Sequence, residues 1–553
     1  MKTRAQTAAV LAAFVLASCS GGGRMTPAPS GGGSGQTAKT QFVVHWPAKN
    51  AKSGLRKTQS ISASAQSISI TVNSGTPQIA NNPGGGTSSI PIDAPVGTDT
   101  FVIKAWDEAN GQGNVLDAAT VSQLIVANAT NTVNATLDGV CAALLATPVA
   151  NQPFLETTTS QITLPNNQQE SLVTGLRLVG TQPESFTVTP VDADGNALLS
   201  SNGPVVVNVA ETGGTAHVGI SSSQSGGVTT VTLTPKLGEP SGQTTTLSIS
   251  SSQCGSGTPW APNSVALNVI GAVYVGDTQS VYAFDQDGNS ILSVATGYPI
   301  SGVAWDSTHN QLDVVTSSGP TTGFGQLYVY TPALSQIATG AFNVTVQKNS
   351  KTTCNALAQI AVQASGNILV ACPSTTPGTN KGFIRVVSVG ISGGVATTAD
   401  ITPASPKWTQ SGTALYDPVS PMVEPNGDVA VADAQSSGYF FDPNGNYLNA
   451  GYNYFTSYAY DPELQNVWGA NSNNVSIWQL TVNTQTYLNN WSVGATPILV
   501  AFDPADQYLY ALTSQGGVTV YAVHQATYST LPQVVVPGTF AGLAAPVQAV
   551  STI

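Results

Sequence analysis

The chain has 553 residues, of which 8% are charged, and its formal net charge at pH 7 is −12. Because ordinary soluble proteins contain about 25% charged residues, this composition argues against a cytosolic enzyme and is typical of exported β-proteins. The acidic balance also disfavours a nucleic-acid partner, since phosphate would repel most of the chain.

The first eighteen residues have the features of a secretory signal peptide. Lys2 and Arg4 give a positively charged start, and an apolar run follows at residues 8–16. That run is too short to span a bilayer, which needs about 20 apolar residues. Residues 1–18 are therefore predicted to be removed, which takes the net charge of the mature chain to −14.

The tetrapeptide Leu16-Ala17-Ser18-Cys19 resembles the lipobox of bacterial lipoproteins at every position. The resemblance implies cleavage before Cys19, thioether lipidation of its sulfur and acylation of its new amino group. Several acyl chains anchor a protein stably in a membrane, whereas one chain binds marginally. Ser20 stands where the family uses aspartate for inner-membrane retention, so the resemblance favours the outer membrane or the cell surface. A plain secretory signal with an incidental cysteine is the alternative.

Residues 19–39 are predicted to form the lipidated start and a flexible tether. The Gly-, Ser- and Pro-rich part, residues 20–36, would have a reach of roughly 20–25 Å. Basic residues gather near this end, because six of the fourteen in the mature chain precede Asp93, the first acidic residue. This basic stretch either lies on anionic lipid headgroups or acts as a solubilising loop.

The rest of the chain reads as all-β. Helical periodicity is nearly absent, and short runs of Val, Ile, Thr, Tyr and Phe are bounded by turn residues. Residues 40–139 contain half-buried strands such as SISITV and TDTFVIKAWD, and they predict a β-sandwich. Residues 140–269 predict a second sandwich, in which FTVTPVDADGN is similar to the strand and hairpin of bacterial immunoglobulin-like repeats. The length also requires more than one domain.

Residues 270–553 contain an internal repeat in which alanine, an aromatic residue and aspartate precede a turn and a hydrophobic strand. The copies are AWDSTHNQLDVV from Ala304, AYDPELQNVWGA from Ala459 and AFDPADQYLYAL from Ala501. The pattern resembles β-propellers of the NHL and YVTN types. The first blade lacks an innermost strand, and residues 540–550 are expected to supply it. That arrangement predicts six blades with no open edge, and seven blades are the alternative.

Four cysteines besides Cys19 are expected to form two disulfides, because the chain is exported. Three pairings are possible. Cys354 and Cys372 flank two strand-like runs, and folding these runs as a hairpin would bring the two sulfurs nearly opposite each other. Cys141 and Cys254 would then pair within a separate domain.

Catalytic and metal-binding motifs are weak. The Asp-x-Asp-Gly-Asn runs from Asp192 and Asp285 lack the later ligands of a calcium loop, so they are predicted to be hairpin turns, as is DPNGN from Asp442. The Gly-x-Ser-x-Gly run at residues 390–394 lacks the following helix of a nucleophile elbow. We predict no catalytic residue, no metal and no cofactor, although a propeller enzyme of the lactonase or dehydrogenase kind stays open.

Aromatic and amide residues recur in segments that, by analogy with the propeller family, surround the central channel. Aromatic ring faces and amide donors with few charges suit a neutral polar ligand such as a glycan. The alternative is that these aromatic residues pack between blades. The candidate ligand-binding residues are Tyr298, Trp408, Tyr416, Tyr452, Tyr454, Asn471, Asn473 and Asn474.

These features predict a surface-anchored bacterial lipoprotein whose propeller head binds an extracellular glycan or protein without catalysis. A scaffolding lipoprotein that contacts other envelope proteins through the propeller rim is one alternative, and a propeller enzyme is the other. A clustered aromatic face would favour the first function, and an apolar patch on a blade edge would favour the second. Convergent carboxylates with perturbed pKa values in the channel would favour the third.

Overall fold

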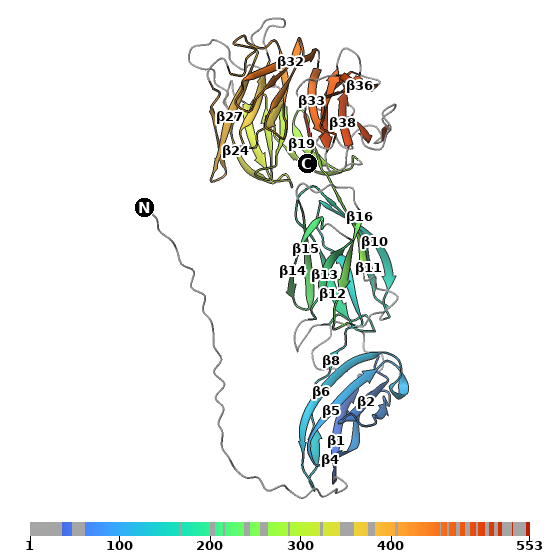
Figure 1. Ribbon diagram of the computed structural model, residues 1–553. Coiled ribbons are helices and arrows are strands. Elements are labelled where there is room, and N and C mark those ends of the chain that lie inside the picture. Colours follow the sequence, from blue (N-terminus) through green and yellow to red (C-terminus); the bar gives the residue numbers. More distant parts are fainter. Residues whose placement is uncertain are drawn as a thin grey trace, which may run out of the picture.

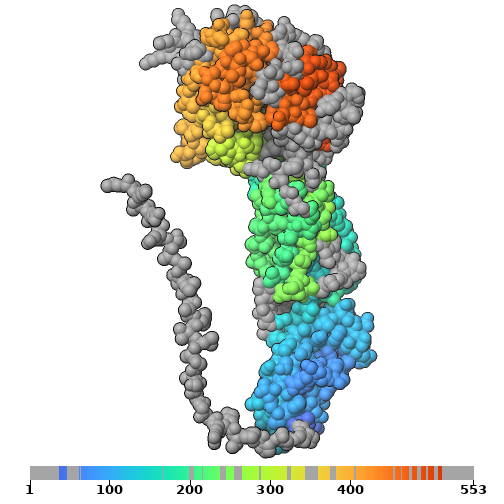
Figure 2. Space-filling view, viewed as in Figure 1, coloured from blue at the N-terminus to red at the C-terminus, as the bar shows by residue number. Residues whose placement is uncertain are grey.

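A computed structural model shows three β-rich bodies that follow one another in chain order (Figure 1). In the space-filling view they stack as a column, with the N-terminal body and the large C-terminal body at opposite ends (Figure 2). The structure describes residues 36–46, 61–62, 64–165, 167–198, 205–213, 216–236, 244–254, 264–285, 288–320, 325–342, 359–373, 382–403, 407–453, 455–461, 464–471, 476–481, 487–493, 496–503, 508–513, 518–522, 533–534 and 549–552.

The N-terminal body is a β-sandwich of two sheets, with strand orders β4-β1-β7 and β3-β2-β5-β6-β8. Side chains of β1 alternate between exposed and buried at every position, and its buried Phe42 packs against Phe101 of the facing sheet. The elements are β1 (Thr37–Trp46), β2 (Ser67–Val72), β3 (Gln78–Asn81), β4 (Gly86–Pro95), β5 (Gly97–Trp106), the short 3-10 helix η1 (Ala109–Gly111), β6 (Val115–Ile125), β7 (Asn131–Val133) and β8 (Asp138–Gly139).

The second body is also a β-sandwich, with strand orders β10-β11-β17-β16-β13 and β14-β15-β12-β9. Both sheets contribute to one core, in which Leu178 and Leu267 meet Phe186 and Val231. The strands are β9 (Ala143–Pro148), β10 (Leu155–Thr163), β11 (Gln169–Val179), β12 (Glu184–Val191), β13 (Asn208–Thr212), β14 (Val218–Ser225), β15 (Val228–Pro235), β16 (Thr244–Ser250) and β17 (Ser264–Ile270).

A disulfide joins Cys141 to Cys254, the pair placed by sequence within one domain, with 4.5 Å between the Cα atoms. Cys141 precedes β9 of one sheet and Cys254 follows β16 of the other, so the bond ties the two sheets of the second sandwich together. Cys372 is disulfide-bonded as well. Its predicted partner, Cys354, lies outside the described residues.

The C-terminal body is built from groups of four antiparallel strands that are consecutive along the chain, and two of these groups join in one eight-stranded sheet. The first sheet is the exception, because its fourth strand comes from the C-terminal end. The strands are β18 (Val273–Gly276), β19 (Ser280–Phe284), β20 (Ser290–Ala295), β21 (Ile300–Asp306), β22 (Gln311–Thr316), β23 (Gly325–Tyr330), β24 (Gln336–Phe342), β25 (Ile360–Val362), β26 (Ile368–Cys372), β27 (Phe383–Ser392), β28 (Val395–Asp400), β29 (Pro418–Val423), β30 (Val429–Asp433), β31 (Ser437–Phe441), β32 (Tyr447–Asn453), β33 (Phe455–Asp461), β34 (Asn466–Asn471), β35 (Ser476–Thr481), β36 (Tyr487–Ser492), β37 (Pro497–Asp503), β38 (Tyr508–Thr513), β39 (Val518–Ala522), β40 (Gln533–Val534) and β41 (Ala549–Thr552).

The innermost strands of these sheets contact one another in a closed ring. Strands β21, β25, β29, β33, β37 and β41 touch in that order, and β41 also touches β21. Strand β41 pairs with β18, so the C-terminal strand completes the first sheet. This is the arrangement of a β-propeller. The pairing strand lies at residues 549–552, later than the expected 540–550, and residues 535–548 lie outside the described part of the chain.

Two neighbouring sheets are joined at their outer edges, a feature that the sequence repeat did not predict. Thr339 of β24 pairs in parallel with Val395 of β28, and the Thr339 amide donates to the Gly394 carbonyl. A Cβ atom on Gly340 would lie 1.9 Å from the Ala396 carbonyl oxygen, so the close approach requires glycine. The two outer strands therefore cover each other's edges in one eight-stranded sheet.

The repeated aspartate ends an innermost strand and organises the turn that follows. Asp306 is buried, and its Oδ1 accepts the backbone N–H groups of Thr308 and His309. Asp461 occupies the same position after β33, and its Oδ1 accepts the N–H of Leu464. The aspartate of the sequence repeat therefore caps the turn that follows its strand.

The three Asp-x-x-Gly-Asn runs form hairpin turns with shared hydrogen bonds, which confirms the turn prediction. In each turn Oδ1 of the aspartate accepts the backbone N–H of the asparagine four residues later. The glycine N–H donates to the aspartate carbonyl in each turn. The aspartates are Asp192, Asp285 and Asp442.

Candidate functional site

The two faces of the propeller are distinguished by their contacts with the second sandwich. Thr181 of the sandwich donates a hydrogen bond to Asn310, in the turn after β21, with Oγ1 2.9 Å from Oδ1. Arg177 of the sandwich contacts Asp285, in the turn after β19. The face that carries these turns is called the stalk face here. The links that enter the innermost strands, and the loops after the second strands, lie on the opposite face, called the far face.

Tyrosine and aspartate side chains meet on the far face where the first two sheets adjoin. Asp277 caps the loop after β18, accepting the N–H groups of Gln279 and Ser280, and the Tyr282 hydroxyl donates to it over 3.1 Å. The Tyr328 hydroxyl donates over 2.7 Å to the carbonyl of Thr296, in the link that carries Tyr298. Burial, followed by the nearby Tyr298, raises the pKa of Tyr328.

A similar group lies at the start of β29. Asp433, at the end of β30, accepts the N–H groups of Asp417 and Gln435. Tyr416 precedes Asp417 and is half-buried, and Tyr439 of β31 interacts with it. Burial raises the pKa of Asp433 despite these N–H donors, and burial likewise raises the pKa of Tyr439. Both groups therefore combine a carboxylate engaged in loop capping with neutral tyrosine rings and hydroxyls.

The sequence nominated Tyr298 and Tyr416 as candidates, whereas Asp277, Tyr328 and Asp433 join these two groups only in the structure. The signal for the two aspartates is present, because VYVGD and VAVAD each end the second strand of a sheet with aspartate. Tyr328 carries no such signal. It joins the group through a hydrogen bond to Thr296, in the link between β20 and β21.

Trp408 does not face a ligand, which corrects its prediction. Its side chain is 2% exposed and packs at 5.3 Å from the ring of Phe441. Its backbone N–H donates to Gly445, in a turn on the stalk face, and Gly445 lies so close to the indole that no Cβ would fit. The long link before β29 thus reaches the opposite face, and the alternative of packing between blades holds for Trp408.

Asn471 is also wrong as a ligand contact, because its side chain is 3% exposed at the end of β34. Of the remaining candidates, Tyr452 lies in β32, and its side chain is outside the described part of the structure. Tyr454, Asn473 and Asn474 lie outside the described residues altogether. Tyr298 and Tyr416 lie in links that lead into innermost strands, and a role in ligand binding stays a prediction for these two residues as for the other four.

Among the residues that the structure describes, no group of three or more His, Cys, Asp and Glu side chains could hold a metal ion. The Gly-x-Ser-x-Gly run is the turn of the hairpin β27–β28, and Gly393 and Gly394 both have positive φ. Such a turn joins two antiparallel strands and presents no nucleophile elbow. Ser392 accordingly pairs with Val395 across the hairpin.

A histidine–carboxylate pair lies on the stalk face. His309 Nδ1 is 2.6 Å from Asp306 Oδ2, and the neighbouring Thr308 hydroxyl donates to the Ala364 carbonyl. Burial, reinforced by Asp306, raises the pKa of the fully buried Asp313 to about 7. Asp306 of the pair caps the turn after β21. The Thr308 contact joins this turn to the turn between β25 and β26, so the residues connect two neighbouring turns and do not form an open reactive site.

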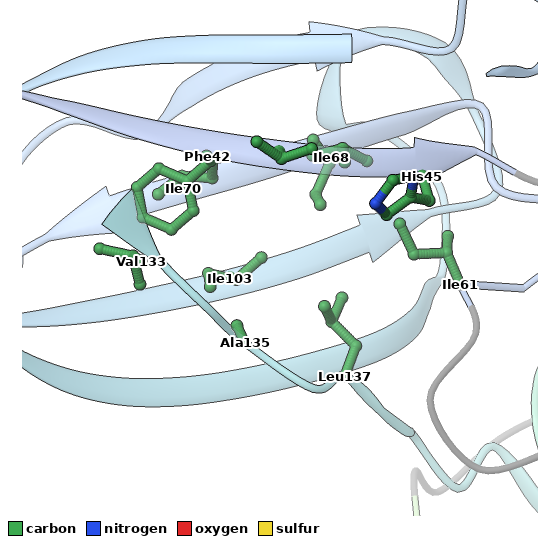
Figure 3. Close-up of a pocket in the computed structure, with 11 residues that line it drawn as sticks. Phe42, His45, Ile61, Ile68, Ile70, Ile103, Val133, Ala135 and Leu137 are labelled. Carbon is green, nitrogen blue, oxygen red and sulfur yellow. The ribbon is translucent and has the colours of Figure 1, made fainter. Parts of the chain in front are cut away.

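The first sandwich contains a cavity of about 110 Å³ beside β1 (Figure 3). Its floor is formed by Ile68, Ile70 and Ile103 of the facing sheet, and the segment from Val133 to Leu137 forms one wall. His45 is the polar side chain on its rim, and the imidazole Nδ1 lies 3.1 Å from the Thr87 hydroxyl. Apart from His45, the residues that line the cavity have apolar side chains.

No helix within the described ranges has the length and hydropathy required to cross a bilayer. No protein-family model matches the chain, and no curated protein matches it.

Solved structures resemble about half of the chain. A chain of a nidogen/laminin complex is 9% identical over 51% of this chain and 98% of its own length, with a TM-score of 0.35. A protein of unknown function from Bacteroides caccae is 13% identical over 51% of this chain and 99% of its own length, with a TM-score of 0.34. The β-propeller domain of Cps50 (Swd1) from Myceliophteria thermophila is 9% identical over 46% of this chain and 93% of its own length, with a TM-score of 0.33.

Proposed function

We propose that this chain is a lipid-anchored protein of a bacterial cell envelope whose six-bladed propeller binds an extracellular ligand without catalysis. The ring of six innermost strands supports the blade count, with the joined outer strands β24 and β28 belonging to two separate blades. The lipobox-like Leu16-Ala17-Ser18-Cys19 supports the anchor and the outer membrane or cell surface as its place.

The start of the first described strand, β1, lies far from the far face of the propeller, and this position is the main support for the proposal. Thr37 pairs with Pro95 at the end of the first sandwich, next to the turn into Gly97. The other end of β5, near Ala105, packs with Ala193 of the second sandwich. The first described strand therefore begins at one end of the column, and the far face of the propeller lies at the other end (Figure 1).

The chemistry of the far face favours a neutral polar ligand, and we propose a glycan. Tyr298 and Tyr416 offer ring faces and hydroxyl groups that can contact the C–H and O–H surfaces of a sugar, while the Tyr328 hydroxyl holds the link that carries Tyr298. Beyond Lys407 the chain has no Lys or Arg, which disfavours an anionic ligand.

Glycan-array binding by the chain from residue 36 onward tests this function. The Tyr298→Ala/Tyr416→Ala double variant is expected to lose at least tenfold in affinity, because stacking and hydroxyl contacts are removed together. Tyr487→Ala is the matched control, since Tyr487 is 41% exposed on β36, an outer strand. An array without binding, or equal loss in the control, would overturn the glycan assignment.

The lipid anchor has a separate test in a bacterial host fed with a labelled fatty acid. Cys19→Ser is expected to lose the label and to move from the membrane fraction to the soluble fraction, because the thioether and its acyl chains cannot form. Cys372→Ser, which alters a disulfide-bonded cysteine, is expected to keep the label. Label that persists in Cys19→Ser contradicts the anchor.

A second function, contact with another envelope protein through the propeller rim, is favoured by one apolar patch. Ile337 and Val395 are both exposed where β24 meets β28. Exposed apolar side chains that gather on one part of a surface are typical of protein interaction sites. Capture of an envelope protein that is lost in Val395→Asp, with the glycan array negative, would favour this function over the first.

A further inference from the structure

Three exposed apolar side chains gather at the end of the first sandwich where β1 begins. Gly97 of β5 pairs with Ile125 of β6 at that end of their ladder. Val96 precedes Gly97, and Leu124 and Val126 flank the buried Ile125. The exposed fraction is 41% for Val96, 59% for Leu124 and 50% for Val126. Exposed apolar side chains that gather in one place are typical of a binding surface, and these three residues are called the tip here.

The part of the chain that carries Cys19 joins the fold beside the tip. Gln36 is the first described residue, and its carbonyl accepts the Val96 N–H over 2.8 Å. Residues 20–36 separate this point from Cys19. A segment of that length spans about 60 Å when fully extended and roughly 20–25 Å as a flexible coil. A bilayer that holds a lipidated Cys19 therefore lies within that distance of the tip.

The segments that form the tip carry no charge. Residues 94–98 and 118–137 contain no Asp, Glu, Lys or Arg. On the adjoining strands, Lys39 of β1 and Asp93 of β4 lie opposite each other in register, and Asp99 is 2% exposed. Moving the tip out of water therefore does not require that a charged group be stripped of its hydration, which is the most costly transfer for a protein surface.

The backbone of the turn that follows Val126 is matched from within. Asn131 is buried, and its Oδ1 accepts the Val126 N–H over 2.9 Å. The Nδ2 group of Asn131 donates to the carbonyls of Val126 and Ala129 over 3.0 and 3.3 Å. Backbone groups that already have a partner do not need water. The turn therefore breaks few hydrogen bonds to water when it enters a less polar environment.

We propose that the tip docks on the bilayer that holds the lipid anchor, with Val96, Leu124 and Val126 in the boundary between headgroups and acyl chains. This inference rests on the proposed lipidation of Cys19. Apolar area buried at the boundary provides the attraction, and the tether keeps the tip at high local concentration near the lipid. Docking holds the first sandwich on the membrane and directs the far face of the propeller away from it.

A spin label on Ala129→Cys measures the depth of the tip. Ala129 lies exposed in the turn beside Val126, and the lipidated Cys19 has no thiol to react with the label. The lipidated mature chain is placed in vesicles of phosphatidylethanolamine and phosphatidylglycerol. Collisions of the label with oxygen, which enters the bilayer, are compared with collisions with a water-soluble nickel complex.

The reference position is Ile79→Cys on β3. Ile79 is 47% exposed and lies beside Gly111, away from the tip. The ratio of oxygen to nickel collisions is expected to be about threefold higher at Ala129→Cys than at Ile79→Cys, because the tip lies in the membrane boundary. Equal ratios in a chain that floats with the vesicles would overturn the docking alone. A chain that does not float would overturn the anchor, and the docking with it.

Two double variants test whether the apolar side chains hold the tip in place. Leu124→Asp/Val126→Asp is expected to lower the ratio at Ala129→Cys to the value at Ile79→Cys, because the new charges stay in water. Val43→Asp/Ile79→Asp is the matched control, since Val43 and Ile79 are equally exposed elsewhere on the same sandwich. It adds the same charge and is expected to keep the ratio. Equal loss in both variants would assign the effect to repulsion from anionic lipid and overturn the docking.

Other occupants of the tip give different results. Spin–spin broadening of the Ala129→Cys label in detergent, without vesicles, would show that the tip binds a second copy of the chain. A high ratio that is lost when salt is added would show that the basic stretch near the anchor holds the sandwich on the headgroups. Either result would overturn the insertion of the tip, for which a ratio that does not depend on salt is expected.

Discussion

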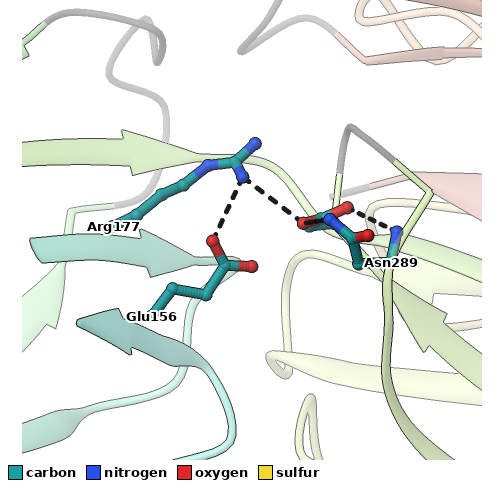
Figure 4. Close-up of polar contacts among 4 residues, drawn as sticks. Glu156, Arg177 and Asn289 are labelled. Carbon is teal, nitrogen blue, oxygen red and sulfur yellow. Dashed lines mark hydrogen bonds and ion pairs between the residues drawn. The ribbon is translucent and has the colours of Figure 1, made fainter. Parts of the chain in front are cut away.

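The two junctions of this molecule use the same hairpin turn in different surroundings. At the first junction the turn from Asp192 meets the N-terminal sandwich, where the hydroxyls of Ser62 and Ser64 both donate to Asp194 Oδ2. At the second junction the turn from Asp285 meets Arg177 (Figure 4). Hydrogen bonds inside each turn fix its shape. In each turn an aspartate side chain also contacts the neighbouring domain.

The apolar contacts beside the two turns differ in size. The first junction packs small residues, among them Ala65, Ala105 and Ala193. The second joins Phe154 and Val179 of the sandwich to Tyr274 of the propeller in one cluster of fully buried side chains. The Tyr274 hydroxyl donates to the Pro332 carbonyl over 2.8 Å, so this large ring is buried without an unmatched polar atom.

The size of the apolar contact at each junction sets where the column resists bending. A buried aromatic side chain contributes about 1.5–3 kcal/mol, whereas a typical hydrogen bond contributes about 1 kcal/mol net. The second sandwich and the propeller are therefore expected to move as one unit, with bending concentrated at the first junction. A membrane-anchored binding protein would gain reach from such a bend without losing the orientation of its head.

The largest expected effect comes from Phe154→Ala. Phe154 is fully buried and packs against both domains, so its removal is expected to cost about 3–5 kcal/mol and to separate the unfolding of sandwich and propeller. Scanning calorimetry measures both effects. Phe186→Ala is the control, since Phe186 is equally buried within the sandwich alone. If Phe154→Ala lowers the free energy of unfolding by less than about 1 kcal/mol and still unfolds in a single calorimetric transition, the two junctions do not differ as proposed.

A smaller effect is expected from Asp194→Ala. Loss of the acceptor for Ser62 and Ser64 is expected to cost about 1 kcal/mol, because their hydroxyls can turn to water instead. Small-angle X-ray scattering is expected to show a wider range of maximum dimensions than in the wild type. Asp442→Ala alters a turn of the same kind within the propeller and is expected to leave those dimensions unchanged. If the range of maximum dimensions in Asp194→Ala equals that of the wild type, the bend does not lie at the first junction.

Local features of this fold could be predicted because their interactions span few residues. The turn from Asp192 follows from hydrogen bonds that reach four positions along the chain. The alternating burial of β1 follows from strand geometry, in which successive side chains point to opposite sides. The repeat of alanine, an aromatic residue and aspartate likewise marks a strand end and its turn.

Non-local features could not be predicted in the same way. The sequence predicts Trp408 as an exposed aromatic residue in a link, but Phe441 and Gly445 enclose its ring. The closing strand was expected at residues 540–550, whereas pairing with β18 uses residues 549–552. Tyr328 joins the far face through a hydrogen bond to Thr296, 32 residues away in the chain.

By itself the sequence determined that the chain folds into β-strands with tight polar turns, and it indicated sandwiches followed by a propeller. These properties depend on period-two burial and on contacts between near neighbours, which a linear pattern records. Only the tertiary structure decided which face of the propeller is free, which aromatic residues are core, and that Arg177 meets Asp285 across 108 positions. Those outcomes depend on the packing of whole domains, because burial and proton affinity are set by every group that comes close in space.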